Sequence, residues 1–122
     1  MFALTDSHRF LLYSAPTDMR KSFDALSGIV ENRLNRKVET SEVFVFVFVN
    51  RRRDKIKLLH WVGSGFVLYY KRLEQGTFEI PHYKISDSAI RLSYAQMVML
   101  IDGLSIVNIK KRVRFSSTVQ SG

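Results

Sequence analysis

The sequence contains no cysteine. This absence excludes disulfides, thiolate metal sites and thiol catalysis, and it is typical of proteins in a reducing compartment. Long apolar runs are also missing, since the longest uncharged one falls far short of the ~18 residues that a membrane span requires. The opening residues, MFALTDSHRF, lack the basic segment and the apolar run of a signal peptide. We therefore expect a cytoplasmic protein.

Acidic residues are few, with 11 Asp and Glu against 19 Lys and Arg and a formal net charge of +8. This excess favours an acidic partner, most often a nucleic acid, although the charge could also serve solubility alone. A chain of 122 residues, 46% of them hydrophobic, is long enough for one core. We expect a single domain over residues 1–122, with an ordered core at about 8–105 and a basic tail at 106–122 that frays.

Motifs of catalysis and cofactor binding are missing as well. None of the three histidines has the spacing of metal ligands, and the acids are scattered along the chain. The sequence has neither a GxxxxGK(S/T) phosphate loop nor a GxSxG nucleophile motif. His60 lies within an apolar run, so we interpret it as a packed or hydrogen-bonded structural residue. We expect no enzymatic activity, no metal and no cofactor.

The stretch from Glu42 to Leu73 contains three β-prone runs separated by two short polar turns. This pattern predicts a three-stranded antiparallel meander. The first run, VFVFVFV, is apolar on both faces, so we expect both faces of this strand to be covered. The second turn, Gly63-Ser64-Gly65, has the residues that a tight hairpin requires.

Basic residues are concentrated in this meander. Between Asn50 and Leu73 the chain has seven basic residues and one acid, Asp54, so this stretch carries +6 of the formal +8. A local basic patch indicates an interaction with a partner. The predicted phosphate contacts of the meander are Arg51, Arg52, Arg53, Lys55, Lys57, Lys71 and Arg72.

Aromatic residues lie beside these cations. A two-residue loop in the second turn places Lys57 opposite Tyr70 and Trp61 opposite Phe66, all on one face. A cation next to an exposed aromatic ring is typical of a platform for single-stranded nucleic acid. The alternative is that Trp61 and Phe66 belong to the core, while Lys57 and Tyr70 extend along its rim. We favour the core for Trp61 and leave both interpretations open for Tyr70.

The residues before the meander predict a strand and a helix. Residues 9–14 form the predicted strand, and the helix is capped by Thr17 or Asp18 and ends near Asn35. Gly28 lies inside this helix, where glycine costs about 1 kcal/mol relative to alanine. We expect Gly28 to let the helix approach the sheet closely.

The residues after the meander are less regular. Residues 77–80 predict a short edge strand, residues 82–92 carry no clear pattern, and Ser93 predicts the cap of a second helix. The predicted fold is α+β: an antiparallel β-meander sheet of four to five strands with two packing helices. The first helix is expected on one face of the sheet, and the second on the other face or at an edge.

Arg20 and Lys21 lie in the first turn of the first predicted helix, where cations oppose the helix dipole at roughly 0.3–1 kcal/mol each. Stability would favour acidic residues here. We therefore predict a second anion site, in which Arg20 and Lys21 join the free N–H groups of the helix start. The alternative is that both side chains point into solvent, or that Arg20 pairs with Asp24.

Three blocks of the sequence carry a resemblance: DMRKSFDALSGIV at 18–30, NRRRDKIKLLHW at 50–61 and GFVLYYKRLEQGTFEIP at 65–81. They resemble the TnpB family of small accessory proteins, which the second reading frame of insertion sequence sixty-six elements encodes. The resemblance runs from about Phe10 to Leu104. Family members often carry glycine where this chain has Arg53, and the VFVFVFVN run is one Phe-Val dipeptide longer than expected.

The resemblance implies a role in transposition beside a separate, larger transposase, and it supplies no catalytic residues. Together with the basic patch, it predicts a non-catalytic accessory factor that binds DNA through a basic β-hairpin. Tyr70 is a candidate stacking residue, and Arg20 and Lys21 are candidate contacts of the second site. The main alternative is a protein-interaction module that docks on the transposase without touching DNA. RNA binding is a third possibility.

Overall fold

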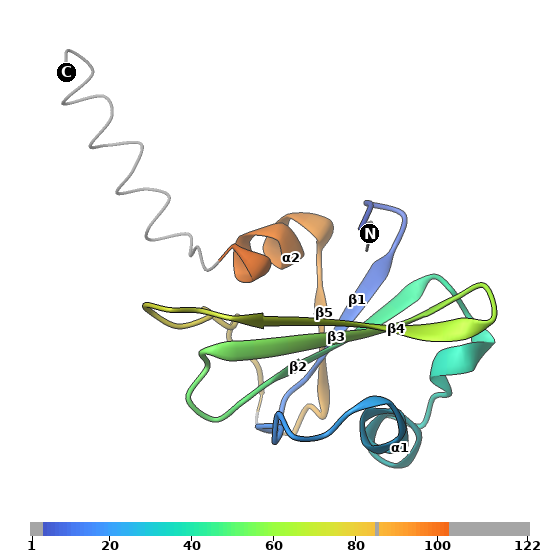
Figure 1. Ribbon diagram of the computed structural model, residues 1–122. Coiled ribbons are helices and arrows are strands. Elements are labelled where there is room, and N and C mark those ends of the chain that lie inside the picture. The colour runs from blue at the N-terminus through green and yellow to red at the C-terminus, as the bar shows by residue number, and fades with distance from the viewer. Residues whose placement is uncertain (1–3, 85, 103–122) are drawn as a thin grey trace.

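The computed structural model describes residues 4–84 and 86–102. These residues form one five-stranded sheet with the strand order β4-β3-β2-β1-β5 (Figure 1). The elements are β1 (Arg9–Tyr13), α1 (Phe23–Arg33), the short 3-10 helix η1 (Val38–Thr40), β2 (Phe44–Val49), β3 (Lys55–Val62), β4 (Gly65–Arg72), β5 (Ala89–Leu92) and α2 (Tyr94–Ile101). The α+β class is confirmed, while the tail predicted at 106–122 lies outside the described residues.

The sheet is mixed, so the prediction of a purely antiparallel sheet was wrong. The meander β2-β3-β4 is antiparallel as expected, but β1 pairs with β2 in parallel, with Phe10 opposite Val45. The chain between them contains α1. Parallel neighbours need such a long crossover, because a short turn cannot return the chain to the same end of the sheet.

The two helices cover opposite faces of the sheet, as Figure 1 shows with α2 above the sheet and α1 below it. Leu26 and Val30 of α1 pack on Phe46, Phe48 and Leu59, together with residues of β1 and η1. The second core, on the α2 side, contains Phe10, Leu12, Val45, Val47, Val49, Ile56, Leu58, Phe78, Leu92, Met97 and Leu100. Alternate residues of β2 therefore enter different cores, which explains why its run is apolar on both faces.

One further prediction about the chain after β4 was wrong, and one strand there was not predicted. Residues 77–80 form no strand; instead Phe78 is fully buried, and its N–H donates to the main-chain oxygen of Arg53 at 2.6 Å. The strand β5, which the sequence did not reveal, pairs antiparallel with β1 and places Leu92 beside Phe10. Ser93 does cap α2, through a capping box with Gln96.

Gly28 does not mark a close helix–sheet approach. A Cβ at this position would meet no atom within 4 Å beyond its own helical neighbours, among the residues that the structure describes. The expected close contact is therefore wrong, and the glycine is tolerated on an open part of the helix surface.

Candidate nucleic-acid interface

The turn between β2 and β3 is organised by Asn50. Its Oδ1 accepts from the N–H groups of Asp54 and Lys55 at 3.1 and 3.0 Å, and its Nδ2 donates to Asp54 Oδ1 at 2.7 Å. The hydrogen bond from Asn50 lowers the pKa of the Asp54 carboxyl, aided by the charge of Lys55. The side chain of Asn50 thus links the first and last residues of the turn. An asparagine directly after an apolar strand is the sequence signal for such a turn.

Arg51, Arg52 and Arg53 form the outside of this turn, and all three are exposed. Their side chains make no hydrogen bond or ion pair to any residue in the ranges 4–84 and 86–102. Arg53 has φ 59°, in the left-handed region. Residues with a side chain rarely adopt this conformation, whereas glycine does so freely. Glycine, which the resemblance implies at this position in other family members, would fit this backbone.

The second predicted anion site lies beside this turn, but not at the start of α1. The helix begins at Phe23, after Ser22 at its N-cap, so the placement of Arg20 and Lys21 in its first turn was wrong. The reason is Asp18, whose Oδ1 accepts the N–H of Arg20 at 2.9 Å. Such a side-chain bond to the backbone competes with helix formation and holds residues 18–21 in a turn.

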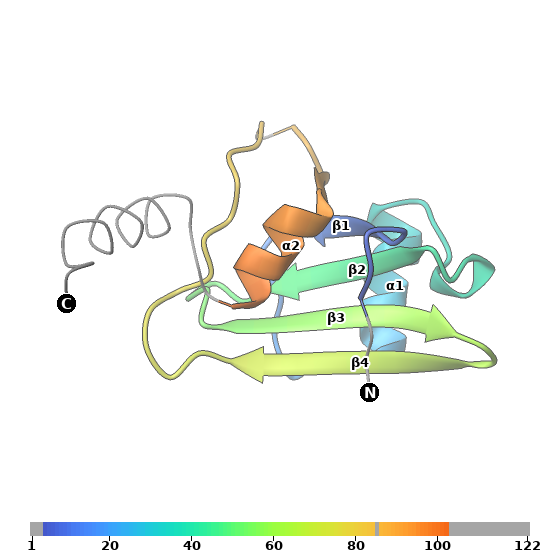
Figure 2. The same ribbon diagram turned by 90° about the horizontal axis from the view of Figure 1, so that it is seen from above.

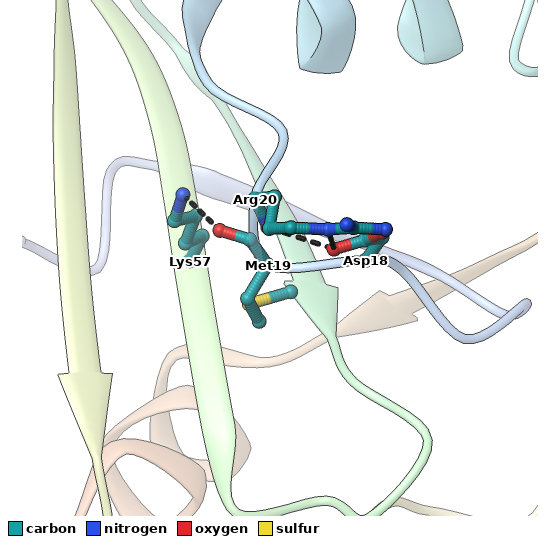
Figure 3. Close-up of polar contacts among 4 residues, drawn as sticks. All are labelled: Asp18, Met19, Arg20 and Lys57. Carbon is teal, nitrogen blue, oxygen red and sulfur yellow. Dashed lines mark hydrogen bonds and ion pairs between the residues drawn. The ribbon is translucent and has the colours of Figure 1, made fainter.

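Arg20 pairs with Asp18 and not with Asp24. Its Nη2 lies 2.6 Å from Asp18 Oδ2, in a pair whose side chains are 92% and 42% exposed (Figure 3). The hydrogen bonds from Arg20 lower the pKa of the Asp18 carboxyl to about 2. Asp18 is therefore charged at neutral pH. An exposed ion pair of this kind contributes little to stability, so the guanidinium can exchange partners at small cost.

Lys57 of β3 holds the turn at residues 18–21 in place through hydrogen bonds to its main chain. Lys57 is 5% exposed, and its Nζ donates to the main-chain oxygen of Met19 at 2.7 Å (Figure 3). The same Nζ donates to the main-chain oxygen of Lys21, also at 2.7 Å. The same Nζ lies 4.6 Å from the ring centroid of Tyr70, which is 51% exposed. Burial lowers the pKa of Lys57. Its donors are directed at the protein itself, so we remove Lys57 from the predicted phosphate contacts and treat it as a positioning residue.

Parts of the two predicted sites form one surface, which the predicted contacts Lys21 and Arg53 do not line. The turn at residues 18–21 and the β2–β3 turn enclose an open depression of about 630 Å³. Four cations and one acid line it together with Tyr70. The charged residues are Arg20, Arg51, Arg52, Lys55 and Asp18. This basic depression carries a net positive charge, and one wall has a half-exposed aromatic ring. Such a surface can bind an anionic chain and stack a base.

The three remaining phosphate contacts predicted in the meander are Lys71, Arg72 and Lys55, and they lie in different places. Lys71 is on the opposite face of the sheet, where its Nζ donates to the main-chain oxygen of Ile101 at 2.7 Å and stabilises the end of α2. Arg72 pairs with Glu74 at 2.8 Å, and both side chains are exposed. Lys55 Nζ lies 4.0 Å from Asp54 Oδ1. Of these cations only Lys55 belongs to the basic depression.

The two other side chains that the sequence singled out are structural. His60 is buried, and its Nε2 donates to the main-chain oxygen of Glu42 at 2.6 Å. Trp61 packs at the margin of the α1-side core, with its ring 5.0 Å from that of Phe66 in a T-shaped arrangement. The predicted register, with Lys57 opposite Tyr70, is confirmed.

Two kinds of feature are not found in the part of the chain that the structure describes. No group of three or more histidine, cysteine or acidic residues is placed to hold a metal ion there. None of the described helices is long and apolar enough to cross a membrane.

Comparison with known proteins decides the family. Residues 8–111 match the model of the IS66 Orf2-like proteins. The chain belongs to this family. Two similar proteins come from Sinorhizobium fredii: the uncharacterized protein y4jC is 30% identical over 104 residues, covering 85% of this chain and 86% of the relative. The uncharacterized protein y4hO is 32% identical over 96 residues, covering 79% and 80%.

No solved structure matches this IS66 Orf2-like protein. The resemblance that the three sequence blocks carried is confirmed by the family match. Membership of the family supports an accessory role associated with transposition. The blocks that contain residues 18–21 and 50–55 are also the two segments that enclose the basic depression.

Proposed function

We propose that this IS66 Orf2-like protein is a non-catalytic accessory factor of transposition that binds DNA through the basic depression. The observation that carries the proposal is the convergence of two separate segments. Arg20 is about thirty residues away in sequence from Arg51 and Arg52 of the β2–β3 turn, yet the three arginines line the same surface. Cations without a structural role are costly to gather, because like charges repel.

The chemistry of the depression suits the sugar-phosphate backbone. Arginine presents a planar fork of donors that matches phosphate oxygens. Arg51 and Arg52 are exposed and make no hydrogen bond or ion pair within the described residues, while Arg20 holds only an exposed ion pair. Phosphate contacts position a protein on DNA without reading its sequence. The ring of Tyr70 can stack on an unpaired base. Removal of such a stacking ring weakens binding by about 1–3 kcal/mol.

A salt titration tests the proposal. Affinity for a short DNA duplex and for a single strand would be measured at several salt concentrations, for the parent and for a variant with Arg51→Ser, Arg52→Ser and Arg53→Ser. Each neutralised phosphate contributes about −0.9 to the slope of log affinity against log salt on duplex DNA. We expect the variant to flatten this slope by about two to three units and to remain folded.

The control is a second triple variant with the same net charge: Arg9→Ser, Arg33→Ser and Arg91→Ser. These three arginines are exposed and lie outside the depression. Equal slopes for both triple variants would mean that net charge, not the depression, drives binding. No DNA binding by the parent, with binding to the purified transposase of the same element, would instead favour the docking alternative.

A further inference from the structure

We infer that two copies of this chain associate through the outer edge of β4, with the two β4 strands antiparallel. β4 is the last strand of the sheet and is eight residues long. It runs along the border of the sheet, and no described element lies beyond it (Figure 2). A long open edge is a template for pairing with another strand. This inference is independent of the proposed DNA binding.

The backbone of this edge has groups available for a second ladder. Val62 pairs with Gly65 across the two-residue loop, and Gly63 has φ 64°. In such a hairpin the pair next to the loop is hydrogen-bonded, and bonded and non-bonded pairs alternate from there. Phe66, Leu68 and Tyr70 therefore direct their N–H and C=O groups away from β3. Within the described ranges, no hydrogen bond to these groups is found.

The two edges of the sheet are treated differently. The opposite edge strand, β5, has only four residues and carries Arg91, and short charged edges resist pairing. β4 has no proline, and its residues from Gly65 to Tyr70 are uncharged. Its cations, Lys71 and Arg72, are confined to one end. Short length, proline and a central charge, which protect edge strands from pairing, are thus missing from β4.

The position of the two cations selects a second copy in the antiparallel direction. Parallel pairing of two β4 strands would set Lys71 and Arg72 against their own copies, and like charges directly opposite are destabilising. Antiparallel pairing centred on Leu68 sets Lys71 opposite Gly65 and Phe66 opposite Tyr70. The edge is therefore complementary to itself: each charged end meets a neutral end, and aromatic rings meet across the junction.

The pairing also has a consequence for the proposed function. A two-fold axis through Leu68, perpendicular to the sheet, leaves both basic depressions on the same face. With the usual spacings of strands and residues the two depressions would lie roughly 30 Å apart. One turn of B-DNA measures about 34–36 Å. A dimer could thus contact successive turns of one duplex, provided that the depression binds DNA.

The test measures the mass of the full chain in solution without DNA, by sedimentation equilibrium. We expect a monomer–dimer equilibrium for the parent. Leu68→Lys places two lysines opposite each other at the two-fold axis, and we expect this variant to be monomeric, with an unchanged circular dichroism spectrum. A monomeric parent up to its solubility limit, or a Leu68→Lys variant that still dimerises, would overturn the inference.

A cross-linking experiment covers the case in which Leu68→Lys fails to fold. The chain has no cysteine, so a single introduced one reports on its own neighbourhood. Directly opposed residues of paired strands lie within the reach of a disulfide. We expect Leu68→Cys to form a covalent dimer on mild oxidation, while Val98→Cys, at an exposed position of α2, remains monomeric. Equal cross-linking of the two variants would contradict the β4 interface.

Discussion

The β2–β3 turn and the strands β3 and β4 use their cations in different ways. Arg51 and Arg52 extend into solvent, while Lys57 and Lys71 donate to main-chain oxygens at 2.7 Å. All four residues belong to the same basic stretch of sequence. The difference shows that a local excess of positive charge contains two populations, one for the protein's own fold and one free for a partner.

The physical cause lies in the strand geometry. A side chain within a strand points either to one face of the sheet or to the other, and both faces of this sheet are covered. A buried ammonium must find acceptors, since leaving it unpaired costs several kcal/mol. Lysine suits this task because its compact charge sits on a flexible stem. The turn has no covering layer, so its arginines need no partner within the protein.

Among variants that test this difference between turn and strand cations, Lys57→Met is expected to change stability most. The change leaves the oxygens of Met19 and Lys21 without their donor, and an unsatisfied buried group costs about 1–3 kcal/mol. We expect the free energy of unfolding to fall by about that amount, as measured by urea denaturation. The matched change Arg52→Met removes the same charge from the turn, where surface substitutions stay within about 0.5 kcal/mol. Equal losses would abolish the distinction between the two populations.

A smaller effect, of opposite sign, is expected for Arg53→Gly. Arg53 holds a positive φ of 59°, which disfavours any residue with a Cβ. Glycine removes this strain, although its greater freedom in the unfolded chain offsets part of the gain. We expect stability to rise by roughly 0.5–1 kcal/mol. Arg52→Gly, at a neighbouring position without positive φ, should give no gain, and a gain of the same size there would argue against backbone strain.

The smallest effect is expected for Asp18→Asn. Asparagine keeps an oxygen for the N–H of Arg20 but removes the charge that holds the guanidinium. Since the pKa of Asp18 is about 2, the parent carries this negative charge at neutral pH. We expect DNA affinity at low salt to rise about twofold. Asp24→Asn, on an exposed position of α1, serves as the control for the lost charge, and an equal rise in that variant would mean that Arg20 is not a contact.

Local patterns predicted the meander, its register, the presence of both helices and the Ser93 cap of α2, because these features depend on residues a few positions apart. The cap of α1, predicted at Thr17 or Asp18, was wrong, since the helix begins after Ser22. The parallel pairing of β1 with β2 and the strand β5 could not be predicted in this way. Both depend on which segments meet across the sheet, and the residues Ala89–Leu92 carry only a short and mixed pattern. Buried Phe78 was assigned to a strand for the same reason.

The candidate site was predicted in part. The arginines of the turn were chosen because basic charge is concentrated in this stretch, and the structure places all three on the surface. Lys57 was misinterpreted, although a signal was present: it alternates with Leu59 on the face that α1 covers. The partners of Lys57, at Met19 and Lys21, lie more than thirty residues away in the chain. That pairing depends on the fold and cannot be read from spacing.

The most direct test compares two single variants, Arg52→Met and Lys71→Met, which remove one positive charge each from the same basic stretch. Salt dependence of duplex binding would be measured for both beside the parent. Our account predicts that Arg52→Met flattens the slope of log affinity against log salt by about 0.9, while Lys71→Met leaves the slope unchanged. Equal flattening by the two variants would contradict the account, because the ammonium bound to Ile101 would then contact phosphate as the turn arginines do.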